Sequence, residues 1–97
     1  MAVVEIITFR LTAAADWHDA ISADQQVQTE FIYRQPGSVR RTTARGDDGE
    51  WLVLQLWRTA ADADAATEAA GRDLAAKRFQ KLIDETTLHV GRYETLD

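Results

Sequence analysis

Residues 50–58, with the sequence EWLVLQLWR, alternate between two apolar sets of side chains. Because the side chains of a strand point alternately to its two faces, the three leucines fall on one side and the two tryptophans on the other. A strand that is apolar on both faces needs cover on both. The simplest arrangement places the leucines beneath helices of the same chain. It leaves the other face, with Gln55 and Trp57, to a partner subunit.

The neighbouring segments predict three more strands. Residues 3–11 are apolar at both parities, which is typical of a central strand. Residues 38–45 contain three arginines, as expected of an edge strand that must discourage further pairing. The Gly-Asp-Asp-Gly sequence at 46–49 predicts a hairpin turn between this strand and the next. Residues 87–96 close the chain as the fourth strand.

Two helical regions lie between these strands. The first is expected to begin at an S-x-x-Q capping box, Ser22 to Gln25, after a short turn capped by Asp16, and to end near Gln35, before Pro-Gly. The second begins at the T-x-x-D sequence of Thr59 and ends near residue 84. A glycine at position 71 is expected to interrupt it.

The resulting order, βαββαβ, fits few topologies. Right-handed crossovers and one hairpin give a ferredoxin-like α+β fold, with an antiparallel sheet ordered 4-1-3-2 and two helices on one face. The two central strands are then the two whose sequences are apolar on both faces. Two helices cover only one face of such a sheet, so we expect a homodimer formed through the open face.

Composition agrees with a single small domain spanning residues 1–97. Hydrophobic residues make up 45% of the chain and charged residues 28%, as in ordinary globular proteins. The formal charge of -5 disfavours nucleic-acid and anionic-membrane partners. The N-terminus has neither a basic leader nor an apolar run long enough to span a bilayer, so we expect a cytoplasmic protein. Without cysteines, and with His18 and His89 far apart, no metal site is expected.

Several short motifs resemble the dimeric α/β-barrel superfamily, in particular its antibiotic-biosynthesis-monooxygenase-like branch. These are the element order, the Pro36-Gly37 stop, the passage QLWRTAADADA and the closing GRYETLD. In that branch a strand often ends in Glu-x-Trp before an acidic, alanine-rich helix, and Gln55-Leu56-Trp57 stands in that place here. The resemblance implies a dimer whose two sheets face each other, with a small apolar pocket between sheet and helices in each subunit.

The resemblance also implies a reaction. It is cofactor-independent monooxygenation of an aromatic or polyketide-like molecule, in which the substrate supplies the electrons and the protein positions it and stabilises its anion. Many members carry a histidine in the second helix, and residues 64–70 have none. Haem-degrading relatives use an asparagine near the end of the first strand, where this chain has Phe9; the chain contains no asparagine. Haem degradation is therefore disfavoured, and no cofactor is expected.

Candidate site residues follow from the expected faces. An inward Arg41 would stabilise a phenolate or carboxylate, although a solvated strand or an ion pair with Glu30 or Glu94 would also account for it. His89 or Tyr93 would move the proton; both lie on one face of the last strand, roughly 13 Å apart, too far for a direct pair. The expected ligand-contacting residues are Phe9, Tyr33, Gln55 and Trp57.

Other interpretations stay open at this point. A buried Gln55 would need a hydrogen-bond partner, either across the dimer axis or from a ligand. The tryptophans would fill a subunit interface as readily as they would stack a ligand. A non-catalytic dimeric module that binds a small molecule or has a structural role is the alternative to the monooxygenase. A cofactor-free isomerase or cyclase on the same scaffold would leave the same sequence pattern.

Overall fold

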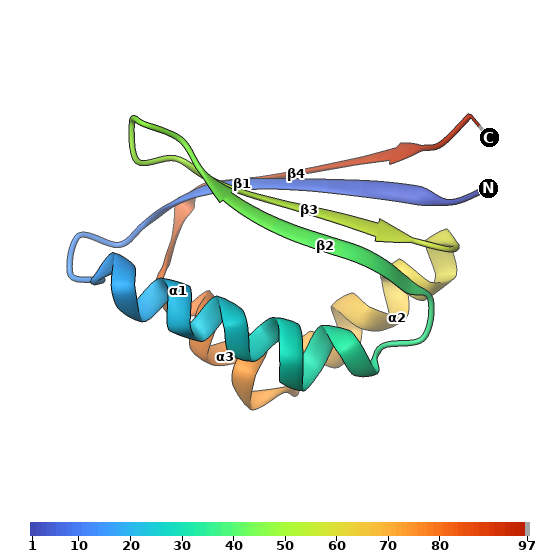
Figure 1. Ribbon diagram of the computed structural model, residues 1–97, viewed down its shortest axis with the longest axis horizontal. Coiled ribbons are helices and arrows are strands. Elements are labelled where there is room, and N and C mark those ends of the chain that lie inside the picture. The colour runs from blue at the N-terminus through green and yellow to red at the C-terminus, as the bar shows by residue number, and fades with distance from the viewer. Residues whose placement is uncertain (97) are drawn as a thin grey trace.

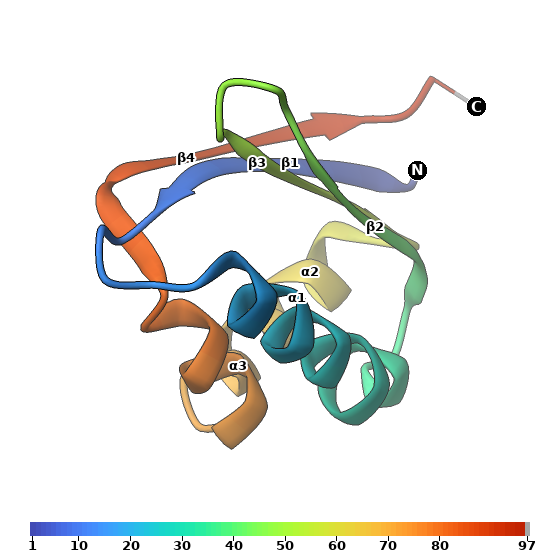
Figure 2. The same ribbon diagram turned by 60° about the vertical axis from the view of Figure 1, so that its left-hand side comes forward.

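The computed structural model describes residues 1–96 as one antiparallel sheet with helices on a single face (Figure 1). Turning the molecule by 60° shows the other face of the sheet uncovered along its length (Figure 2). The elements, in chain order, are β1 (Val3–Leu11), α1 (Trp17–Gln26), the π-helical η1 (Val27–Phe31), the 3-10 helix η2 (Ile32–Arg34), β2 (Ser38–Arg45), β3 (Trp51–Trp57), α2 (Ala60–Ala70), α3 (Leu74–Gln80) and β4 (Ile83–Glu94).

The strand order is β2-β3-β1-β4, which confirms the predicted ferredoxin-like arrangement. β1 and β3 are the central strands, and their register runs from Val3 opposite Trp57 to Phe9 opposite Trp51. The arginine-rich β2 lies at an edge, as its sequence predicts. Opposed residues of paired strands share a face of the sheet, so the register decides which side chains meet the helices.

The first helical region differs from its prediction at its start. The carboxylate of Asp16 accepts a hydrogen bond from the backbone N–H of His18 and caps α1, so Ser22 lies inside the helix and the expected capping box is wrong. The end is as predicted, because Gly37 adopts a φ of 80°, a conformation that favours glycine. The π-helical segment Val27–Phe31 within this run was not predicted.

The second helical region begins and breaks where the sequence predicts. Thr59 caps α2, its hydroxyl accepting a hydrogen bond from the backbone N–H of Asp62. The helix ends beside Gly71, and Asp73 caps the separate helix α3. That helix ends at Gln80, and β4 begins earlier than expected because residue 83 pairs with the end of β1.

The predicted assignment of faces is wrong for β3. Trp51, Val53, Gln55 and Trp57 are buried, and the cavity between sheet and helices is lined by three of them; the leucines of β3 are half-buried on the other side. The residues of the helices explain why the tryptophan face of β3, rather than its leucine face, lies beneath them. Five of their buried residues are alanines, which fill little volume, so the largest side chains of the core, the tryptophans, come from the sheet and add to Phe31 and Phe79 of the helices. These alanines are Ala20, Ala23, Ala63, Ala66 and Ala76.

The open face of the sheet is apolar but only partly exposed. Its half-buried side chains lie on the two central strands and are Val4, Ile6, Leu52, Leu54 and Leu56. None of the helices within residues 1–96 combines the length and the apolar character that crossing a bilayer requires.

Candidate functional site

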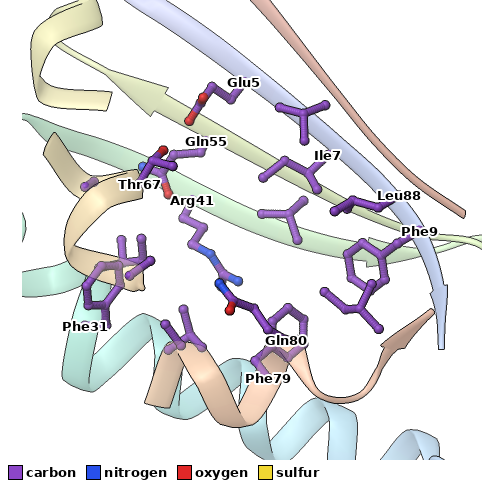
Figure 3. Close-up of a pocket in the computed structure, with 18 of the residues that line it drawn as sticks. Glu5, Ile7, Phe9, Phe31, Arg41, Gln55, Thr67, Phe79, Gln80 and Leu88 are labelled. Carbon is purple, nitrogen blue, oxygen red and sulfur yellow. The ribbon is translucent and has the colours of Figure 1, made fainter. Parts of the chain in front are cut away.

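A cavity of about 350 Å³ lies between the sheet and the helices (Figure 3). Its walls are mainly aromatic and aliphatic. They include Phe9 and Trp57 from the central strands, Phe31 from η1 and Phe79 from α3. The Phe9 and Phe79 rings meet edge to face with their centroids 5.7 Å apart, which fixes one end of the cavity.

The space exists because small residues stand opposite large ones. The helices contribute three alanines to the lining, Ala66, Ala70 and Ala76, whose side chains fill little of the space. The π-helical segment brings Val27 and Phe31, its first and last residues, to the cavity wall. Single π turns inside α-helices are frequent at functional sites. These small helix residues therefore leave a cavity in the core between the helices and the sheet.

The exposed lining residues show where the cavity opens. Val90 and Leu88 of β4 are 59% and 39% exposed although they line the cavity. Thr67 of α2 and Gln80 of α3 are also exposed lining residues. The mouth therefore lies between β4 and these two helices, and the buried polar residues of β2 and β3 lie away from it, toward the opposite edge of the sheet.

Arg41 is the cation of the cavity wall. Its side chain is only 6% exposed, and its Nη2 donates to Asp24 Oδ1 of α1 over 2.7 Å. The Thr43 hydroxyl donates to the same oxygen over 2.9 Å, so the carboxylate holds strand and helix together. This partner is neither of the two that the sequence suggested, Glu30 and Glu94. A guanidinium carries five N–H donors in a planar fork, so one ion pair does not use up its capacity.

Gln55 presents a different kind of polar group. Its Nε2 donates to Ser38 Oγ over 3.2 Å and to the Leu56 carbonyl over 3.3 Å. Because a carbonyl oxygen can only accept, the nitrogen end of the amide is the end that faces Leu56. The Oε1 atom is buried and has no hydrogen-bond partner within the described residues. It is therefore a free acceptor on a residue of the cavity wall.

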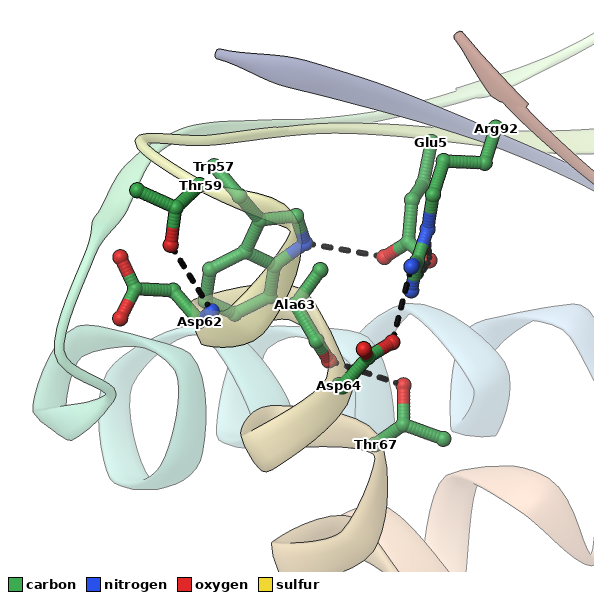
Figure 4. A network of polar contacts seen from close by, with 8 residues as sticks. All are labelled: Glu5, Trp57, Thr59, Asp62, Ala63, Asp64, Thr67 and Arg92. Carbon is green, nitrogen blue, oxygen red and sulfur yellow. Dashed lines mark hydrogen bonds and ion pairs between the residues drawn. The ribbon is translucent and has the colours of Figure 1, made fainter. Parts of the chain in front are cut away.

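A polar network joins Glu5 to three other elements, and it runs from the buried Trp57 to the exposed Asp64 (Figure 4). Glu5 Oε1 accepts from Trp57 Nε1 over 2.9 Å, and Oε2 accepts from Arg92 Nη2 over 3.1 Å. Arg92 Nη1 also donates to Asp64 Oδ1 of α2 over 2.8 Å. Hydrogen bonds to Asp64 and then to Glu5 raise the pKa of Arg92 above its usual range. The network fixes the Trp57 ring and ties β4 to α2 beside the cavity.

Four of the residues suggested by the sequence line the cavity. They are Phe9, Arg41, Gln55 and Trp57. The two on β3 reach it because the tryptophan face, rather than the leucine face, lies beneath the helices. Gln55 and Arg41 are register partners on adjacent strands, so their side chains start from neighbouring positions on the same face.

The other three suggested residues lie elsewhere. Tyr33 is 83% exposed on η2 and is not part of the lining. His89 and Tyr93 are exposed residues of β4 that pair with Thr8 and Val4, whose side chains belong to the open face. The structure thus places both candidates for proton transfer on the side of the sheet opposite the cavity.

Sequence reasoning missed several residues of the site. Glu5 gave a signal, because it shares the parity of residues that must be buried, and Arg92 is its register partner on β4. Asp24 gave none, since its contact with Arg41 joins a helix and a strand that are distant in sequence. Within residues 1–96, no group of three or more histidine, aspartate or glutamate side chains is arranged to hold a metal ion.

Comparison with solved structures shows the same fold in proteins of low sequence identity. SnoaB, a cofactor-independent oxygenase from Streptomyces nogalater, is 20% identical and superposes with a TM-score of 0.81, covering 99% of this chain and 94% of its own. A candidate antibiotic biosynthesis monooxygenase from Bordetella bronchiseptica is 14% identical, with a TM-score of 0.80 and coverage of 98% and 97%. Rv0793 from Mycobacterium tuberculosis is 15% identical, with a TM-score of 0.73 and coverage of 100% and 97%.

No protein-family model matches the sequence, and no curated protein matches it either. The structural matches nevertheless span nearly the whole chain. They confirm, at the level of the fold, the resemblance to monooxygenase-like ferredoxin-fold proteins that the sequence motifs suggested.

Proposed function

We propose that the protein is a cofactor-independent oxygenase acting on small aromatic molecules. The observation that carries the proposal is the apolar cavity with Arg41 and Gln55 buried in its wall. Ligand sites are typically apolar hollows of about 300–1,000 Å³ with a few convergent polar groups. The shared fold with SnoaB, described as a cofactor-independent oxygenase, supports the same reaction class.

In such a reaction the substrate is its own reductant. An activated CH₂ group beside a phenol or ketone loses a proton, and the resulting anion transfers electrons to O₂. One oxygen atom becomes the new C=O of the product, and the other leaves as water with the two hydrogens of the CH₂ group. The positive charge of Arg41 favours the anion in this apolar surrounding. Glu5 is the carboxylate of the cavity lining and the candidate proton acceptor, in place of His89 or Tyr93.

Oxygen uptake with a panel of anthrones and hydroquinones tests the proposal. We expect turnover by the wild-type chain, and a loss of about 10²-fold or more for Arg41→Met, as when one stabilising donor is removed from an anion site. Tyr33→Phe, on an exposed residue outside the cavity, is the control and should retain activity. Absence of uptake across the panel contradicts the oxygenase. Conversion of a substrate without uptake would instead indicate an isomerase or cyclase.

A second candidate is a non-catalytic binding module. It is favoured by the pairing at the cavity, where Glu5 is held by Arg92, Arg41 is held by Asp24, and no histidine lines the wall. In this arrangement the charged groups of the wall act as structural ion pairs. Saturable binding of an aromatic ligand without any chemical change would support this module, whereas multiple turnover would contradict it.

We further propose a homodimer formed through the open face of the sheet. The half-buried leucines of β3 lie at its centre, and burying them against a second copy would remove apolar surface from water. His89 and Tyr93 would then lie at or near the interface. Light scattering at micromolar concentration checks the assembly, and a stable monomer contradicts it.

A further inference from the structure

A row of polar and charged residues crosses the sheet on the face that meets the helices. It consists of register partners, one from each strand, and these are Arg41, Gln55, Glu5 and Arg92. Each end of the row is bonded to an aspartate of a helix, Asp24 of α1 at one end and Asp64 of α2 at the other. The row and its two aspartates thus contain two cations and three carboxylates, and they bring no surplus positive charge to the cavity.

Asp24 offsets the charge of Arg41 in a place from which water is largely excluded. The two side chains are 16% and 6% exposed, and Asp24 Oδ1 accepts from Arg41 Nη2 over 2.7 Å. The Thr43 hydroxyl donates to the same oxygen over 2.9 Å and so holds the carboxylate in position. Because charges interact more strongly where water is excluded, Asp24 weakens the attraction of Arg41 for any anion in the cavity.

The ion pair leaves hydrogen-bond donors of Arg41 available. A guanidinium has five N–H groups, and the bond to Asp24 uses one of them. Within residues 1–96, Gln55 Oε1 is the single fully enclosed side-chain nitrogen or oxygen without a hydrogen bond, so any nitrogen of Arg41 that makes no bond is accessible. Figure 3 shows the guanidinium extending from β2 into the space between sheet and helices, among the residues that line the cavity. Arg41 therefore presents donors to the cavity with little net charge.

This combination favours a neutral hydrogen-bond acceptor over an anion. An aromatic carbonyl group accepts an N–H bond and loses much less hydration than a carboxylate does on entering an apolar cavity. A carboxylate would also meet the negative charges of Asp24 and Glu5 as it approached Arg41.

We infer that Asp24 is a specificity-determining residue. It offsets the charge of Arg41 without using up its N–H donors, and so makes the cavity select neutral aromatic carbonyl compounds over aromatic carboxylates. The inference rests on the proposed function in taking this cavity as the substrate site. The substrate would then enter uncharged, and negative charge would develop on its carbonyl oxygen only during the reaction, beside the same donors.

Equilibrium dialysis of 2-acetylnaphthalene, 2-naphthoate and 2-ethylnaphthalene at neutral pH tests the inference. The three compounds share one ring system and carry a ketone, a carboxylate or neither. None has a CH₂ group beside a phenol or ketone, so binding is measured without turnover. We expect the ketone to bind the wild-type chain about tenfold more tightly than either of the others, because only it accepts a bond from Arg41 at a small cost in hydration.

Asp24→Asn removes the charge that offsets Arg41 and keeps an oxygen for the same hydrogen bonds. The affinity for 2-naphthoate relative to the ketone should rise about tenfold or more in this variant, because a nearby carboxylate is gone. Asp19→Asn is the matched control, since it removes the same charge from an exposed residue of the same helix. Its affinity ratio should stay within about twofold of the wild-type value, because solvent screens an exposed charge.

Binding of 2-naphthoate to the wild-type chain as tightly as the ketone overturns the inference, as does equal binding of 2-ethylnaphthalene or no binding of the ketone. An equal shift in Asp19→Asn and Asp24→Asn also overturns it, because the effect would then reflect the net charge of the protein. The wild-type ranking stands even if Asp24→Asn does not fold. Oxygen uptake is measured separately: turnover of anthrones without the ketone preference contradicts the inference alone, and the preference without turnover contradicts the oxygenase alone.

Discussion

Both faces of the sheet are apolar, but their side chains differ in kind and in burial. The cavity face carries large aromatic side chains together with buried polar groups, namely Glu5, Arg41 and Gln55. The open face carries half-buried aliphatic side chains of the central strands, such as Leu54. A face with large aromatic and polar side chains can line a ligand cavity. A face of uniform aliphatic side chains is better suited to packing against a second subunit.

The helices account for this division. The buried alanines of the helices, such as Ala63 and Ala66, supply little volume to the core. Tryptophan rings on β3 can bridge the remaining distance, and leucines would leave it largely empty. Where even the aromatic rings do not fill the gap, the cavity remains. The composition of the helices therefore decides both the orientation of the sheet and the position of the site.

Removing a large side chain from the cavity face should have the largest effect. Trp57 is 2% exposed, so Trp57→Ala should lower the free energy of unfolding by about 3–5 kcal/mol. Leu54→Ala, on the half-buried open face, should cost about 1–2 kcal/mol in comparison. Urea denaturation checks both values. Equal losses would contradict the assignment of Trp57 to the better-packed face.

Removing the charge of Glu5 should have the next largest effect. Glu5→Gln should lower the free energy of unfolding by about 1–3 kcal/mol, since it weakens the bonds to Trp57 and Arg92; solvent moderates the loss because the Arg92 side chain is 35% exposed. A double-mutant cycle with Arg92→Met isolates the pair. A coupling energy near zero in urea denaturation would show that the ion pair does not hold β4 to the central strands.

A charge on the open face tests its proposed role in assembly. Leu54→Asp should raise the dissociation constant of the dimer by about tenfold or more, equivalent to about 1.4 kcal/mol, because it buries an unpaired carboxylate. Leu74→Asp is the matched control, since Leu74 is 85% exposed on α3. Analytical ultracentrifugation measures both. Unchanged association for Leu54→Asp would place the subunit contact elsewhere.

Local patterns were enough to predict most of the fold. Alternation identified the strands, Thr59 and Gly71 marked the start and the break of the second helical region, and the arginines identified β2 as an edge. The orientation of β3 was predicted wrongly, because both of its faces are apolar and the deciding factor is the small volume of residues on other elements. Weighing alanine-rich helices against tryptophans would have given the correct face.

The site was predictable only in part. The sequence suggested Arg41 as an inward cation, and its side chain is buried. Its partner Asp24 depends on how α1 lies across β2, which no local pattern reveals. The predicted placement of His89 failed through a detail of register. Pairing with Thr8 puts it on the open face, while its neighbours Leu88 and Val90 line the cavity.

The smallest expected effect concerns the start of α1, the helix that covers the cavity face. A hydrogen bond from the backbone N–H of His18 lowers the pKa of Asp16 below its usual value of 3.8. A lowered pKa in the folded state means that the charged cap stabilises the protein above the usual value, and that this contribution is lost as the pH falls through the lowered one. Asp16→Asn keeps an oxygen acceptor without the charge, so the urea midpoint of the variant should fall less steeply than that of the wild-type chain below about pH 4. Parallel pH profiles of the two proteins would show that the Asp16 charge adds nothing to the cap.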